Sequence, residues 1–121
     1  MKWRLLLLST IILSNCDNSK QIRTAERETP ATFLSIKETP WVKGSDYVEG
    51  TLANRASKTD YGNIVMIVQF YSTDGSKIGT ERIVEFEILK SGEYRTYKHN
   101  IHPPSLTGRL EVIIDRAQFV D

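Results

Sequence analysis

The chain has 121 residues, which is enough for one ordinary domain. Its composition, 40% hydrophobic and 26% charged, is that of a globular protein, and its formal net charge of +1 does not indicate a nucleic-acid-binding protein. The single cysteine excludes an intramolecular disulfide bond.

The first sixteen residues have the three-part layout of a secretory signal. Met1–Arg4 carries two positive charges, Leu5–Leu13 forms an apolar core, and Cys16 stands where the chain turns polar. The apolar core is too short for a membrane-spanning helix, which needs about 20 residues. Leu13–Cys16 resembles a bacterial lipobox, which implies a signal peptide over residues 1–15 and a lipid-modified Cys16. The alternative is a plain secreted protein in which the cysteine is incidental.

This leader predicts a membrane-anchored lipoprotein of the bacterial cell envelope, periplasmic or surface-facing, that carries palmitate or a related acyl chain on Cys16. Residues 16–31 then form the lipidated cysteine and a tether. Ile22 is the only sizeable aliphatic residue of that segment, so the segment buries too little apolar area to order itself. We therefore expect a flexible spacer, with a short amphipathic helix around Ala25–Glu28 as the alternative.

About seven short strands are expected in residues 32–121, because runs of β-branched and aromatic residues alternate with turn residues. The predicted strands are residues 32–37, 46–54, 63–71, 77–80, 82–89, 94–101 and 110–115, the last extending toward 119. Trp41 and Val42, next to Pro40, are expected at an edge or a bend. No segment has a 3.6-residue apolar period, so the sequence predicts an all-β antiparallel sandwich. A small open barrel is the competing architecture.

The central strand is predicted at residues 63–71, which form the longest apolar run outside the leader, closed by Asp74-Gly75. Its two faces are both apolar, and they are formed by Ile64, Met66, Val68 and Phe70 and by Val65, Ile67 and Tyr71. The second face is either covered by other parts of the domain or left open. If it is open, Val65, Ile67 and Tyr71 form a partner surface, with Trp41 at its rim.

The order of these features resembles the FxLYD domain. The matching features are the pattern from Val48 to Asn54, a long apolar strand that ends in Phe70-Tyr71, the Asp74-Gly75 turn, and Ser91–Glu93 before a strand that contains Tyr97. The resemblance covers roughly residues 41–114. It implies an immunoglobulin-like β-sandwich of the kind found in bacterial envelope lipoproteins, and it implies no catalytic residues.

The polar residues do not predict a chemical site. His99 and His102, three apart on a strand, face opposite sides and cannot jointly hold a metal, so no metal or cofactor is expected. Glu81, Glu85 and Glu87 share a strand face that is expected to be solvated and neutralised across a hairpin by Arg95 or Lys98. We therefore expect a protein that is not an enzyme.

Three functions follow from these patterns. The first is a lipid-anchored, non-catalytic envelope module that contacts the membrane through Cys16 and a protein partner through the sandwich. The second is a binder of an apolar small molecule or lipid between the sheets. The third, favoured least, is an envelope enzyme.

Overall fold

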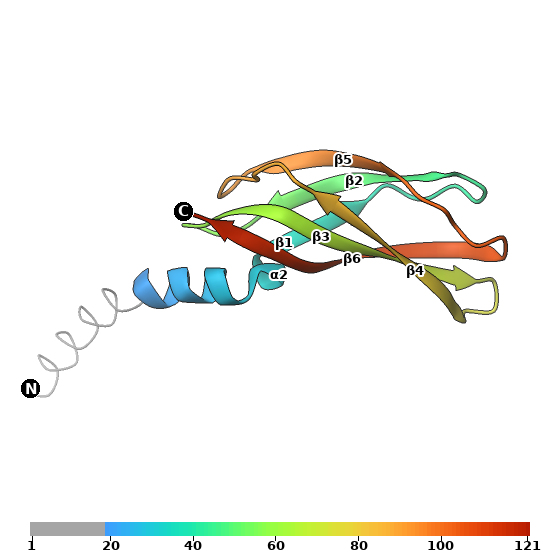
Figure 1. The fold of residues 1–121 in the computed structure, drawn as a ribbon, viewed down its shortest axis with the longest axis horizontal. Helices are drawn as coiled ribbons and strands as arrows, with labels where there is room; N and C mark the ends of the chain where they lie inside the picture. The colour runs from blue at the N-terminus through green and yellow to red at the C-terminus, as the bar shows by residue number, and fades with distance from the viewer. Residues whose placement is uncertain (1–18) are drawn as a thin grey trace, which may run out of the picture.

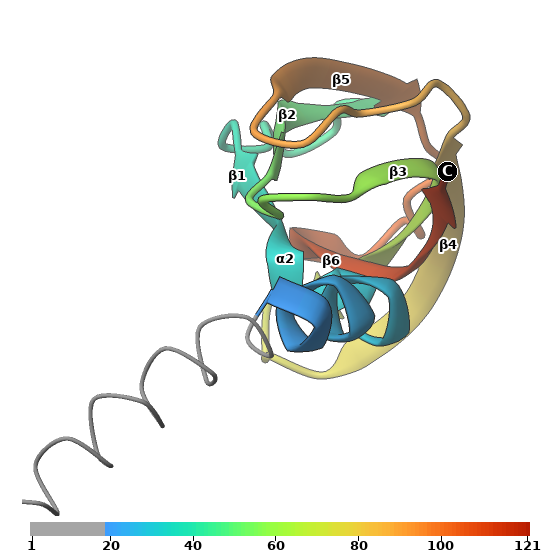
Figure 2. The same ribbon diagram turned by 90° about the vertical axis from the view of Figure 1, so that its left-hand side faces the viewer.

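The computed structural model describes residues 19–121 and forms two three-stranded antiparallel sheets (Figure 1). The first sheet has the order β1-β2-β5, with β1 at Leu34–Glu38, β2 at Tyr47–Asn54 and β5 at Tyr94–Asn100. The second has the order β4-β3-β6, with β3 at Asp60–Ser72, β4 at Lys77–Glu85 and β6 at Thr107–Val120. Figure 2 shows the two sheets as layers that face one another. The predicted all-β antiparallel sandwich is therefore confirmed.

Strand β3 is the central strand of its sheet, as the sequence predicts. It pairs with β4 on one edge and with β6 on the other. Alternate side chains from Ile64 to Phe70 point into the sandwich, where Ile64, Met66 and Val68 are fully buried. Leu52, Tyr97 and Ile101 of the other layer belong to the same core cluster. Burial of each such side chain stabilises the fold by roughly 1.5–3 kcal/mol.

The structure has six strands where the sequence predicts about seven. Trp41 and Val42 lie in the loop between β1 and β2, not in a strand, and the segments predicted at 77–80 and 82–89 are one strand that ends at Glu85. Beyond Glu85 the chain leaves the sheet, and Leu89 makes only an isolated bridge to Tyr61.

The N-terminal part of the described chain differs from the predicted flexible spacer. Residues 19–28 are helical, a segment that includes and extends the alternative helix predicted around Ala25–Glu28, and we call it the N-terminal helix. A second helix, α2 (Pro30–Phe33), leads directly into β1. The N-terminal helix lies at the end of the sandwich where β3 begins and β6 ends (Figures 1 and 2). No helix of the described residues is long and apolar enough to cross a membrane. Cys16 and the predicted signal peptide lie outside the described residues.

The two open sides of the sandwich are bridged by side chains. On one side, the Glu38 carboxylate of β1 accepts a hydrogen bond from the backbone N–H of Val112 in β6. Burial raises the pKa of Glu38, and nearby Glu111 adds to that effect. On the other side, His99 of β5 contacts Glu85 of β4, with 3.2 Å between Nε2 and Oε1. The two sheets are therefore joined by polar contacts at their edges as well as by the core.

Gly50 permits a close approach that the sequence indicates for this position. It lies in the middle of β2, directly opposite Tyr97 in β5. A Cβ atom at Gly50 would lie 2.7 Å from the Lys37 carbonyl oxygen and 2.8 Å from the Tyr97 hydroxyl oxygen. Because one of these atoms belongs to the backbone, it cannot rotate away. Burial raises the pKa of Tyr97 to about 12, with further contributions from Glu38 and Glu85.

We expect Gly50→Ala to lower the free energy of unfolding by about 1–3 kcal/mol, because the added methyl group overpacks the space under Tyr97. Urea unfolding monitored by circular dichroism measures the change. Gly79→Ala is the matched control, since its Cβ would be 3.5 Å from the nearest atom, in Pro104, which is an ordinary contact. An equal free energy of unfolding for the two variants would show that a methyl group at Gly50 causes no steric overlap with Lys37 and Tyr97.

Candidate functional site

The outer face of the β4-β3-β6 sheet carries a group of apolar side chains. Val65 and Ile67 of β3 point to this face, opposite Val84 of β4 and Ile113 of β6 respectively. Val65 is 6% exposed although it lies outside the core cluster, whereas Ile113 is 39% exposed. We call Val65, Ile67, Val84 and Ile113 the outer apolar patch. The sequence pattern predicts the two residues from β3 but not Val84 and Ile113, because only the strand register places those two on this face.

Arginine side chains surround the outer apolar patch. Arg82 lies opposite Ile67, and Arg116 lies opposite Val65. Arg109 lies over the ring of Tyr71, 4.0 Å from its centroid, so Tyr71 is half-buried under a cation. The carboxylates of Glu111 and Asp115 approach Arg109 and Arg116 at 3.8 and 4.0 Å. The patch thus has an apolar centre and a border that contains three arginines.

The outer face of the β1-β2-β5 sheet has a different character. Glu49 lies opposite Lys98, and Thr51 lies opposite Thr96, so these cross-strand pairs are polar. The Lys98 ammonium lies 4.4 Å from the centroid of the Tyr47 ring, which it partly covers. The two outer faces therefore differ, and the larger apolar content belongs to the sheet that contains β3.

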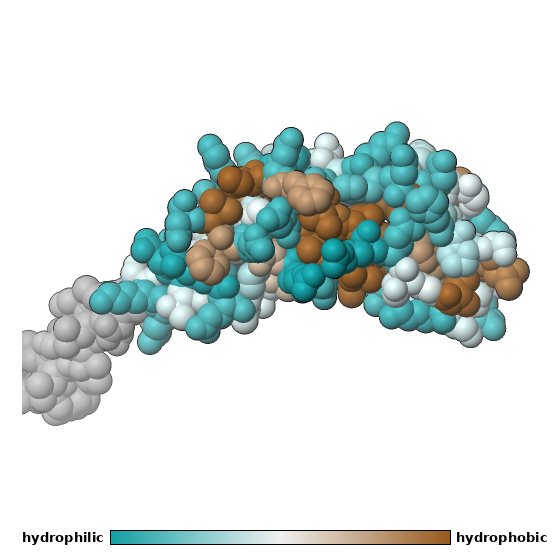
Figure 3. Space-filling model, in the orientation of Figure 1, coloured by the Kyte–Doolittle hydropathy of each residue, from teal (hydrophilic) through white to brown (hydrophobic). Residues whose placement is uncertain are grey.

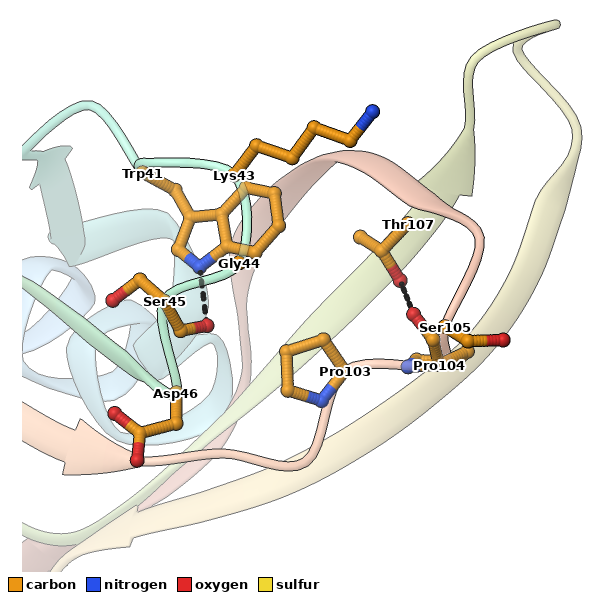
Figure 4. A pocket seen from close by; sticks show the side chains of 9 residues that line it. All are labelled: Trp41, Lys43, Gly44, Ser45, Asp46, Pro103, Pro104, Ser105 and Thr107. Carbon is orange, nitrogen blue, oxygen red and sulfur yellow. Dashed lines mark hydrogen bonds between the residues drawn. The ribbon is translucent and has the colours of Figure 1, made fainter.

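Trp41, predicted at the rim of the same surface, lies elsewhere. It stands in the β1–β2 loop, packs against the core and donates a hydrogen bond from its indole nitrogen to the Ser45 carbonyl oxygen, at 3.1 Å. Figure 4 shows Trp41 beside a hollow of about 220 Å³ whose opposite wall includes Pro103 and Pro104. Tyr71, Val65 and Ile67 do not line this hollow. The structure therefore places Trp41 in a separate loop-lined hollow at the end of the sandwich opposite the N-terminal helix.

Both histidines form contacts with glutamates of β4. His99 contacts Glu85, and the His102 ring nitrogen Nδ1 lies 3.4 Å from the Glu81 carboxylate. The backbone N–H of His102 also donates to Glu81, at 2.7 Å. Two of the three glutamates predicted to be solvated, Glu85 and Glu81, are thus drawn toward the histidines, with side chains only 18% and 23% exposed. The third, Glu87, is 84% exposed and lies 3.8 Å from the Arg95 guanidinium, as the sequence predicts.

Between the edges of β4 and β5 lies a groove of about 670 Å³. Its lining includes the core residues Ile83 and Tyr97, and also Glu85, Arg95 and His99. The Arg95 side chain reaches across to the Ile88 carbonyl oxygen, at 2.5 Å. This charged border does not suit a purely apolar ligand. Within residues 19–121, no group of three or more His, Cys, Asp or Glu side chains is placed to hold a metal ion.

The N-terminal helix is attached to the sandwich by a buried carboxylate. Glu26 is 1% exposed and accepts hydrogen bonds from the backbone N–H groups of Ser57 and Lys58, at 2.8 and 3.0 Å, and from the Ser57 hydroxyl. Burial raises the pKa of Glu26, but these hydrogen bonds outweigh it and hold the pKa below 4.5. The Tyr61 hydroxyl donates to the Glu26 carbonyl oxygen at 2.5 Å.

The loop that receives Glu26 is shaped by Asn54, which is 1% exposed. The Asn54 side-chain nitrogen donates to the carbonyl oxygens of Thr59 and Leu89, and its side-chain oxygen accepts from the Ala56 N–H. This network fixes the loop between β2 and β3. The backbone N–H groups of Ser57 and Lys58 in this loop are consequently held in position for the Glu26 carboxylate.

We expect Glu26→Gln to weaken the attachment of the N-terminal helix by about 1.5–3 kcal/mol, the value of hydrogen bonds to a charged group. Hydrogen exchange of amides 19–28 measures this. Because the pKa of Glu26 is lowered by folding, its stabilisation is present above pH 4.5 and is lost as the pH falls through the folded-state value. The difference in amide exchange between the wild-type protein and Glu26→Gln should therefore become smaller as the pH falls below the folded-state pKa of Glu26. The neighbouring Glu28→Gln, on an exposed side chain, should leave exchange unchanged.

Comparisons with known proteins yield one similar structure. The chain is similar to the crystal structure of a DUF1425 family member from Shewanella sp. PV-4, with a TM-score of 0.46 and 14% sequence identity over 69% of this chain and 76% of that chain. A likeness of this extent carries no argument about function. No family model and no curated protein matches the chain, so the FxLYD resemblance is not confirmed.

Proposed function

We propose that this chain is a lipid-anchored protein of the bacterial cell envelope whose β-sandwich is a non-catalytic interaction module. The leader that ends at Cys16 supports the anchor. The difference between the two outer faces supports the interaction role, and it is the observation on which the proposal depends.

The partner surface in this proposal is the outer apolar patch. Two of its side chains, Ile67 and Ile113, lie directly opposite each other at the surface, and the arginines around them favour a protein partner with an apolar centre and acidic borders. The polar face of the other sheet serves no such role.

We expect a photocrosslinking residue at Ile113 to capture an envelope protein in living cells. Thr96, on the outer face of the other sheet, is the matched control position and should yield no product. Arg82→Glu should reduce the yield at Ile113, because it reverses one charge on the border of the patch. Equal products from positions 113 and 96, identified by mass spectrometry, would contradict the assignment of the surface.

The anchor is tested separately. Cells given labelled palmitate should incorporate it into the wild-type protein and not into Cys16→Ala, because the thiol is the only attachment atom in the proposal. Ser14→Ala, which leaves the cysteine in place, should retain the label. A wild-type protein without label, or a labelled Cys16→Ala variant, would remove the anchor from the proposal.

A further inference from the structure

The attachment of the N-terminal helix assembles a group of cations that the sequence does not reveal. Lys20 and Arg23 belong to the helix, and Lys58 belongs to the loop between β2 and β3. The three side chains line one surface hollow of about 370 Å³ together with Ser19 and Thr24. We call Lys20, Arg23 and Lys58 the basic cluster.

The buried carboxylate of Glu26 determines this arrangement. The backbone N–H of Lys58 donates to Glu26, at 3.0 Å, so the hydrogen bond that attaches the helix also places the Lys58 side chain beside it. The Lys58 ammonium then donates to the Ser19 hydroxyl, at 2.9 Å. Lys58 is thus brought to the first described turn of the helix from 39 residues along the chain.

The basic cluster has no acidic side chain among the residues that line its hollow. The Glu26 carboxylate is buried and bonded to the loop backbone, and the next cation of the helix, Arg27, is paired with Asp121 at 2.5 Å. Three positive charges are therefore concentrated in one place on a chain whose formal net charge is +1. Figure 3 shows teal and white surface beside the grey segment, and Ile22 on this helix is 41% exposed.

The position of the basic cluster along the chain indicates which binding partner lies within its reach. Ser19 is three residues after Cys16, the cysteine that carries the lipid in the proposed function. A chain of three residues spans at most about 11 Å, which is close to the distance over which a charged bilayer surface acts on a cation. An anchored chain therefore holds these cations at the height of the lipid headgroups.

We propose that the basic cluster binds the headgroups of anionic phospholipids in the membrane that holds the lipid anchor. This inference rests on the proposed anchoring at Cys16. In this arrangement the N-terminal helix, and not a flexible spacer, connects the sandwich to the membrane surface. Its helix-bearing end faces the bilayer, and its other end, with the β1–β2 loop and the β3–β4 turn, faces away (Figure 1).

Lysine reactivity on vesicles tests the orientation in the lipidated full chain. The protein is added to vesicles of phosphatidylcholine, or of phosphatidylcholine with about one-third phosphatidylglycerol, and treated with a membrane-impermeant acetylating reagent. Lys20 and Lys58 should react severalfold more slowly on the anionic vesicles, and high salt should abolish the difference. Lys43 and Lys77, at the opposite end of the sandwich, are internal controls and should not change. The proposal would be overturned if Lys20 and Lys58 reacted at the same rate on both kinds of vesicle, or if the reaction of all four lysines were slowed equally.

Charge variants provide the second measurement, hydrogen exchange of amides 19–28. Phosphatidylglycerol should slow exchange in wild type and in a matched variant with Lys37→Gln, Lys43→Gln and Lys77→Gln. The Lys20→Gln, Arg23→Gln, Lys58→Gln variant should lose this effect, and Arg23→Gln alone should weaken it about fivefold. On phosphatidylcholine vesicles alone, amides 19–28 of the variants should exchange at the wild-type rate, which shows that the helix is intact. If the triple variant exchanges faster there, its helix is disturbed and the single variant Arg23→Gln is used to test the role of the cluster. A triple variant, or an Arg23→Gln variant, that behaves like wild type would refute the role of the cluster.

Failure of the anchor is recognised independently. The wild-type protein should float with neutral phosphatidylcholine vesicles if Cys16 carries a lipid, whatever the basic cluster does. Flotation with neutral vesicles but no effect of phosphatidylglycerol on Lys20 and Lys58 overturns only the headgroup contact. Absence of flotation with neutral vesicles contradicts the anchor and removes the basis of the inference.

Discussion

Packing of the inner face of β3 against the β1-β2-β5 sheet is the constraint on which the rest of the structure depends. Ile64, Met66 and Val68 have no exposed surface, and β3 is the strand that joins β4 and β6 into one sheet. Side chains of a strand alternate between its faces, so burial of this set forces Val65 and Ile67 outward. The outer apolar patch is therefore a direct consequence of how the core is filled, completed by residues of the flanking strands that register brings alongside.

A second set of interactions, all polar, organises the end of the sandwich that carries the N-terminal helix. The Asn54 amide fixes the loop between β2 and β3, and that loop presents two N–H groups to the Glu26 carboxylate. The Asn54 and Glu26 side chains are both buried, and each would be costly to leave without its hydrogen-bond partners. The order of the helix consequently depends on the order of the loop, and both depend on the strands that hold the loop ends.

In the proposed function these two features have complementary roles. The attached helix holds Ser19, three residues after the proposed anchor, at a fixed place on the sandwich, and the outer apolar patch lies along the side of the domain. A partner of the patch would then meet it at a defined height above the bilayer. A flexible spacer would not impose this geometry, because a random coil has a broad distribution of end-to-end distances and only its root-mean-square value is defined.

The sequence by itself determined where most of the strands lie, the central position of residues 63–71, the turn at Asp74-Gly75 and the close approach at Gly50, because alternation and turn chemistry are local properties. Gly75 indeed has a φ of 89°, which favours glycine. The sequence did not determine that residues 77–85 form one strand instead of parts of two. Only the tertiary structure decided that Ile113 joins Ile67, that Trp41 lies apart from them, and that Glu85 meets His99. It also replaced the expected flexible segment with an attached helix over residues 19–28. The expectation of a flexible segment came from its low apolar content. The helix is instead attached through Glu26, whose carboxylate accepts hydrogen bonds from a loop some thirty residues away, and such a contact leaves no periodic signal in the sequence.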